Sequence, residues 1–66
     1  MSEIAYSVPG LGCENCERAV TSELLAVEGV EAVLVDLRTR LVTVRGPALD
    51  DSLLRAAIGE AGYDVS

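Results

Sequence analysis

The sequence predicts an α+β fold, and three features of the chain lead to this prediction. Three stretches alternate apolar residues with small or polar ones, as half-buried strands do. Two other stretches repeat apolar residues every three or four positions, as one face of a helix does. Glycine or proline stands between most of these stretches, where turns are expected. With 66 residues, the chain is expected to form a single domain, residues 1–66, with a modest hydrophobic core.

The first strand and the first helix occupy the N-terminal half. The strand is expected over residues 3–8, because a proline–glycine pair ends the alternation there. The helix is expected over residues 15–27, where the apolar positions share one face and acidic residues near the start suit the positive end of the helix dipole. Gly29 should terminate this helix.

A hairpin and a second helix are expected in the C-terminal half. Residues 30–37 and 41–45 alternate again, and the polar residues between them are suited to a hairpin turn. The acids and serine at residues 50–52 are typical of a helix start. The helix should end at Gly62, and residues 63–65 are long enough for a short fourth strand.

The resulting order, β-α-β-β-α-β, consists of two β-α-β halves, and a faint repeat supports this division. In both halves a glycine, an apolar residue and an acid follow the helix, at residues 29–31 and 62–64. Two right-handed β-α-β units can interleave into one antiparallel sheet. We therefore expect a ferredoxin-like sandwich with a four-stranded antiparallel sheet and two helices on one face. In this fold the loop that carries Cys13 lies at the same edge as Tyr63.

The composition excludes several classes of function. The net charge of −6, with five arginines and no lysine or histidine, disfavours binding to nucleic acid because phosphates would be repelled. No apolar stretch approaches the roughly 20 residues of a membrane span, so no direct membrane insertion is expected. The N-terminus lacks the basic and apolar regions of a secretory signal. A cytoplasmic location, with thiols kept reduced, is the resulting expectation. The acidic surface suits solubility or a partner with a basic docking face.

The only two cysteines, Cys13 and Cys16, lie where the first strand gives way to the first helix. A disulfide across so short a loop would gain little in chain entropy, so a structural bridge explains the pair poorly. The unpaired N–H groups and the dipole at a helix start stabilise thiolates, which are the metal-binding form. Soft thiolates select Cu(I), zinc and similar ions. A structural zinc site needs four Cys or His ligands, and two sulfurs are better suited to a low-coordinate monovalent ion.

Three stretches, SVPGLGCENCERAV, VEGVEAVLVDL and AIGEAGYDV, resemble the heavy-metal-associated domain family of copper chaperones. The same module occurs at the N-termini of copper-transporting P-type ATPases. The family motif G-M-x-C-x-x-C reads here as residues 10–16, with Leu11 in place of the methionine. The resemblance implies that Cys13 and Cys16 bind one Cu(I) and pass it, by exchange of thiolates, to a copper-transporting P-type ATPase or similar acceptor. It implies a carrier and not an enzyme.

The resemblance also assigns roles to residues beside the cysteines. The methionine that Leu11 replaces generally packs beneath the metal loop, and a Met-to-Leu exchange conserves volume. Relatives that handle divalent ions often carry an aspartate at the position of Gly12, so this glycine weakens a divalent preference. A tyrosine at the position of Tyr63 lies near the loop in bacterial copper chaperones and shields it from water. A core aromatic whose hydroxyl reaches solvent is a second interpretation, and the two are compatible.

The surface around the motif leaves several interpretations open. Glu14 and Asn15 lie between the thiols and are expected on the loop surface. Arg18 either offsets the charge of a metal–thiolate site or is a solvated helix residue. Glu14, Glu17 and Glu23 would form an acidic face beside the cysteines, where the transfer partner docks in this family.

Alternative functions remain open at this point. The same thiols could serve another soft or heavy metal, such as zinc, cadmium or mercury, in a detached transporter domain or a sensor. A dithiol oxidoreductase is a further alternative, but such enzymes usually have a longer chain and aromatic or proline residues beside the thiols. The start at Met1 and the end at Ser66 are those of a free-standing chaperone, although an excised domain would look the same. We expect a monomer, and two loops sharing copper through four thiolates would give a dimer.

Overall fold

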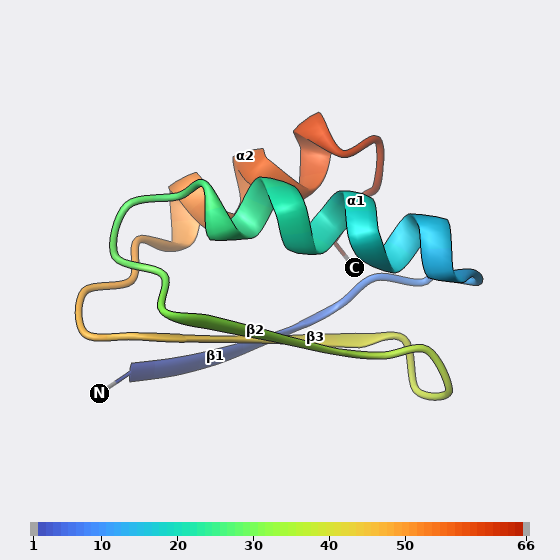
Figure 1. Ribbon diagram of the computed structural model, residues 1–66, viewed down its shortest axis with the longest axis horizontal. Helices are drawn as coiled ribbons and strands as arrows, with labels where there is room; N and C mark the ends of the chain where they lie inside the picture. Colours follow the sequence, from blue (N-terminus) through green and yellow to red (C-terminus); the bar gives the residue numbers. More distant parts are fainter. Residues whose placement is uncertain (1, 66) are drawn as a thin grey trace.

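The computed structural model describes residues 2–65, which contain three strands and two helices. Their order is β1 (Ser2–Ser7), α1 (Glu14–Leu25), β2 (Ala32–Asp36), β3 (Leu41–Gly46) and α2 (Asp51–Glu60). β3 lies between β1 and β2 and pairs antiparallel with both. Both helices cover one face of this sheet (Figure 1). The α+β class and the one-sided helix layer agree with the sequence prediction, and the strands and the first helix begin and end within two residues of their expected bounds.

The predicted fourth strand is wrong for the part of the chain that the structure describes. Residues 63–65 follow α2 but belong to no strand. α2 ends in a Schellman motif, in which Gly62 has φ +92° and the Gly62 N–H donates to the Gly59 carbonyl. The Tyr63 N–H donates to the Ile58 carbonyl at 3.2 Å. Because helix termination uses the Tyr63 amide, this residue cannot donate a hydrogen bond to a strand beside it.

The hydrophobic core lies between the sheet and the helices. Alternate residues of β1 and β3 point into it, and one face of each helix closes it from above. No polar or charged side chain within residues 2–65 is buried. The fully buried side chains are Val8, Leu11, Val20, Leu24, Val42, Val44, Leu54 and Ile58. One of them, Leu11, belongs to the loop before α1, so this loop is anchored in the core.

α2 is attached to β1 by a polar cluster at its first turns. Asp50 caps the helix by accepting hydrogen bonds from the amides of residues 52 and 53. The Tyr6 hydroxyl donates to Asp51 at 2.6 Å. The Arg55 guanidinium lies 5.6 Å from the centre of the Tyr6 ring and pairs with Asp51 at 2.9 Å. Burial, and then the hydrogen bond to Asp51, raises the pKa of Tyr6 to about 12.

Neither α1 nor α2 is long and apolar enough to cross a membrane, and the described residues include no other helix.

Candidate metal centre

Cys13 is the N-cap of α1. Its backbone is extended, with φ −153° and ψ 165°, and its carbonyl accepts the first helical hydrogen bond from the Glu17 amide at 3.1 Å. Its Sγ accepts from the Cys16 amide at 3.4 Å. A cap position is usually occupied by Ser, Thr, Asp or Asn, whose oxygen satisfies a free amide at the helix start. A sulfur takes this place here, so the Cys13 sulfur lies at the positive end of the helix.

The two sulfur atoms face each other across the first turn of α1. Cys13 Sγ and Cys16 Sγ are 2.8 Å apart. Both cysteines are free, Cys13 is exposed and Cys16 is half-buried. The structure therefore brings together the two residues that the sequence proposes as metal ligands, with one sulfur open to solvent.

The pKa of the Cys16 thiol is lowered from 9.0 to about 7. The largest cause is the hydrogen bond with the Cys13 side chain, followed by the hydrogen bond from the Tyr63 hydroxyl. The amides of Gly12 and Cys13 contribute further stabilisation, and partial burial acts in the opposite direction. A substantial fraction of Cys16 is therefore a thiolate near neutral pH, the form that binds metals.

Tyr63 covers one side of the cysteine loop. Its ring lies against Gly10, because a methyl group added at Gly10 would be 3.2 Å from Tyr63 Cδ1. The interaction of its hydroxyl with the Cys16 thiol, and then partial burial, raises the pKa of Tyr63. The structure thus places Tyr63 beside the loop, at the edge where the sequence predicts it.

Leu11 and Gly12 hold very different positions in the same loop. Leu11 is 0% exposed, and its amide donates to the Val8 carbonyl at 3.1 Å. Gly12 is exposed, and a methyl group added there would have no neighbouring atom within 4 Å. Space would therefore permit a side chain at residue 12, so the loop lacks an acidic ligand there because of the sequence and not because of crowding.

Within residues 2–65, no three His, Cys, Asp or Glu side chains lie close enough together to hold a metal ion. Glu14 and Glu17 occupy the first turn of α1 but do not complete such a set with the cysteines.

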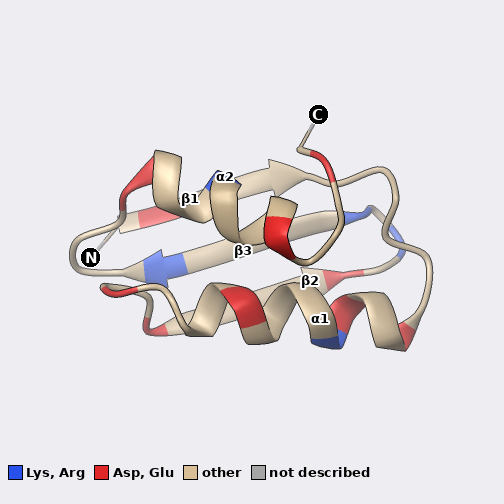
Figure 2. Ribbon diagram, turned by 90° about the horizontal axis from the view of Figure 1, so that it is seen from above, with Lys and Arg blue, Asp and Glu red and all other residues tan. Residues whose placement is uncertain are grey.

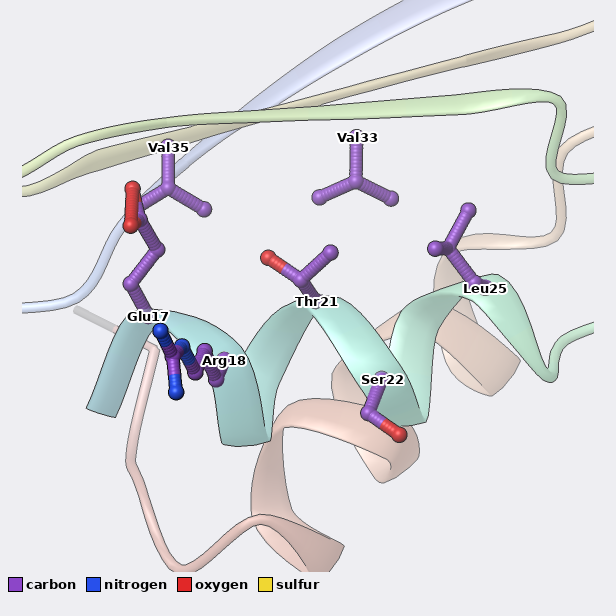
Figure 3. Close-up of a pocket in the computed structure, with 7 residues that line it drawn as sticks. All are labelled: Glu17, Arg18, Thr21, Ser22, Leu25, Val33 and Val35. Atoms are coloured by element: carbon purple, nitrogen blue, oxygen red, sulfur yellow. The ribbon is translucent and has the colours of Figure 1, made fainter. Parts of the chain in front are cut away.

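Arg18 and Glu17 lie at one end of a groove between α1 and β2 that the sequence analysis missed. The groove has a volume of about 530 Å³. Figure 3 shows Val33 and Val35 pointing from β2 toward α1, with Thr21 opposite them. The alternation of Val33 and Val35 in the sequence was the only signal for this groove. It does not predict how α1 lies relative to β2, and the groove depends on that arrangement. Neither cysteine lines this groove.

Comparison with known proteins identifies the family. The heavy-metal-associated domain family matches residues 5–64, which include both cysteines, Leu11 and Tyr63. The chain belongs to this family. As a heavy-metal-associated domain it is similar to the copper chaperone CopZ of Staphylococcus epidermidis, with 36% identity over 70 residues and 98% of each chain covered. A solved structure described as CopZ metallochaperone matches with a TM-score of 0.93, 33% identity, and coverage of 98% of this chain and 100% of that chain.

Other relatives are longer than this heavy-metal-associated domain. The heavy metal-associated isoprenylated plant protein 31 of Arabidopsis thaliana is 40% identical over 59 residues, which are 89% of this chain and 42% of the plant protein. The chain also spans 7% of the copper-transporting ATPase 1 of Rhizobium meliloti. The domain is therefore found in chaperones and within larger proteins.

Proposed function

We propose that this heavy-metal-associated domain is a copper chaperone in which Cys13 and Cys16 bind one Cu(I) and release it to an acceptor by ligand exchange. The observation that carries the proposal is the pair of free sulfurs at the start of α1, 2.8 Å apart, with one of them exposed. Both sulfurs are soft ligands of the kind that Cu(I) prefers.

The electrostatics of the loop support binding of the ion. Cys16 is readily deprotonated because its pKa is about 7, and the N-terminus of α1 favours the negative charge of two thiolates. The two sulfurs must separate to place an ion directly between them. Each metal–sulfur bond is about 2.3 Å long in zinc sites, and two such bonds end to end exceed the present sulfur–sulfur distance of 2.8 Å. The exposed Cys13 side chain is free to make this movement, while Leu11 keeps the loop anchored in the core.

Release follows from the small number of ligands. A two-coordinate ion has room for a thiolate from an acceptor, which forms a new metal–sulfur bond before the bond to Cys13 or Cys16 breaks. The oxidation state of copper does not change, and no free ion is released. As a carrier of this kind the domain would catalyse no covalent chemistry.

The acceptor that we propose is a copper-transporting P-type ATPase or a related protein. Support comes from the likeness to CopZ chaperones and from the match within a protein named as a copper-transporting ATPase. We further propose that the domain works in the cytoplasm as a monomer, which copper shared between two loops can join into a dimer. Gly12, which adds no oxygen ligand, favours Cu(I) over the divalent alternatives.

A competition titration tests the metal assignment. Reduced protein and a chromogenic Cu(I) chelator would compete for copper under anaerobic conditions. We expect one equivalent to be withheld from the chelator by the wild type and by Leu11→Met, a control that leaves the sulfurs in place. The double variant Cys13→Ser, Cys16→Ser should withhold none. Retention of copper by the double variant would contradict the assignment of the ligands.

The same titration with Zn(II) separates the two metals. We expect a zinc chelator to remove Zn(II) far more easily than the copper chelator removes Cu(I), because the site supplies only two protein ligands. If the protein retained Zn(II) more tightly than Cu(I), the two cysteines would still be the metal ligands, but the metal carried would be zinc and not copper.

A further inference from the structure

A second groove lies between the two helices and is independent of the cysteines. It has a volume of about 370 Å³, and no strand residue lines it. Its apolar residues come from α2 and from the turn that follows α1, and they include Leu53, which is 50% exposed. The lining residues are Glu23, Ala26, Val27, Glu28, Leu53, Ala56, Ala57 and Glu60. Ala26 follows the last residue of the 12-residue helix α1 and Cys13 precedes the first, so the helix separates them by about 20 Å.

Three glutamates line the groove together with its apolar residues, and no basic residue lines it. Figure 2 shows acidic positions along both helices. The ion pairs of the described residues join Arg45 to Glu3 and Arg55 to Asp51, so the three glutamates of the groove have no ion-pair partner within residues 2–65. The groove therefore combines exposed apolar surface with an unbalanced negative charge.

Two of these glutamates occupy positions that helix electrostatics disfavour. Glu60 is the last residue of α2, and Glu23 lies in the last turn of α1, at the opposite end of this helix from Cys13. The expectation that Glu23 lies beside the cysteines was therefore wrong. The carbonyl end of a helix attracts cations, yet neither helix has a basic residue in its last turn. These acids therefore cost the isolated domain some stability. Residues that oppose the helix dipole and do not stabilise the fold in another way are characteristic of a functional surface.

We propose that this groove binds a basic amphipathic helix of a partner protein. An apolar side chain of the partner would pack against Leu53, and its Lys or Arg side chains would pair with Glu23, Glu28 and Glu60. A helix fits because the groove lies between two helices and has no strand edge to extend. The groove between α1 and β2 is lined by one acidic residue, Glu17, and one basic residue, Arg18. Because these charges balance, they do not favour a basic or an acidic partner. The proposal is independent of the metal that the cysteines bind.

The test uses the metal-free full chain and a labelled model peptide of leucine and lysine, about 14 residues or roughly four helical turns long. Fluorescence anisotropy should show saturable one-to-one binding that weakens as salt is added. A peptide with the same charges but serine in place of leucine should bind much more weakly. Equal binding of both peptides would show charge attraction alone and overturn the proposal.

Matched variants locate the binding surface. The triple variant Glu23→Gln, Glu28→Gln, Glu60→Gln should bind the peptide roughly tenfold more weakly, as expected for three exposed ion pairs. The control triple variant removes the same charge from exposed residues outside the groove, and its binding should change by no more than about twofold. Its substitutions are Glu14→Gln, Glu31→Gln and Asp64→Asn. Equal losses in the two triple variants would contradict the proposal.

The apolar residues of the groove are tested in the same assay. Leu53→Ser should weaken binding severalfold, whereas Leu34→Ser should not, although Leu34 is similarly exposed, at 53%, on β2. Amide chemical shifts of the wild type provide a readout that needs no variant. On addition of peptide they should change along the groove and stay constant around Cys13. Changes confined to the cysteine loop or to the sheet would rule the groove out.

Discussion

At the residue scale, the reactivity of the site depends on how Cys16 is surrounded. Its thiolate is stabilised mainly by the Cys13 side chain and then by the Tyr63 hydroxyl, and burial opposes both only in part. The Cys16 sulfur is therefore the more enclosed of the two, and the exposed Cys13 sulfur is the more accessible to solvent.

Replacement of Tyr63 by phenylalanine tests this account of Cys16. The substitution keeps the ring beside Gly10 but removes the hydroxyl donor. The pH midpoint for alkylation of Cys16 in the metal-free protein should be near 7 in the wild type and should move upward in Tyr63→Phe. Alkylation by iodoacetamide, resolved by mass spectrometry of the peptides, measures this midpoint. Tyr6→Phe is the matched control, and an unchanged midpoint in Tyr63→Phe would contradict the role of the hydroxyl.

At the element scale, α2 is held to β1 by the hydrogen bond between Tyr6 and Asp51. The Tyr6 hydroxyl is the largest cause that lowers the pKa of Asp51 in the folded protein. A carboxyl with a lowered pKa stabilises the fold above its ordinary pKa of 3.8, and this contribution is lost as the pH falls through the folded value. The anchor of α2 should therefore weaken in acid.

Tyr6→Phe should lower the free energy of unfolding at pH 7 by about 1 kcal/mol, the value for an ordinary hydrogen bond, because water screens the half-exposed Asp51. Urea denaturation of the wild type and the variant measures the difference. The difference should shrink as the pH is lowered below the ordinary pKa of 3.8. A difference that stays constant from neutral to acidic pH would show that Asp51 does not contribute through this bond.

At the scale of the whole molecule, stability rests on a small core. A domain below about 70 residues seldom has more than roughly 3–5 kcal/mol of stability, and here that core contains neither a disulfide nor any polar or charged side chain among residues 2–65. Loss of one large core side chain should therefore affect folding as a whole.

Two neighbouring leucines of α2 provide a matched pair for this prediction. Leu54 is 0% exposed and Leu53 is 50% exposed. Leu54→Ala should cost about 2–5 kcal/mol, enough to unfold much of the population, whereas Leu53→Ala should change stability by less than about 1 kcal/mol. Circular dichroism during urea denaturation compares them. Similar losses for the two variants would mean that the core does not extend to Leu54 as described.

Local sequence patterns predicted most of the secondary structure of this protein. Alternation located the three strands, and helical spacing with caps located both helices, because these features depend on residues near one another in the chain. The spacing of Cys13 and Cys16 pointed to a thiolate pair for the same reason. The repeat that ends each helix led correctly to Gly62 but wrongly to a strand after it, since the Schellman motif uses the Tyr63 amide.

The sequence by itself therefore determined the three strands and two helices, the family and the two candidate ligands. Only the tertiary structure decided what lies beside them: the Tyr63 ring against Gly10, the burial of Leu11, and the two grooves flanking α1. Each of these contacts joins segments far apart in the chain, or elements whose relative positions are set by packing. No local pattern records such a distance, which is why the acids between the helices could be counted from the sequence but not recognised as one surface.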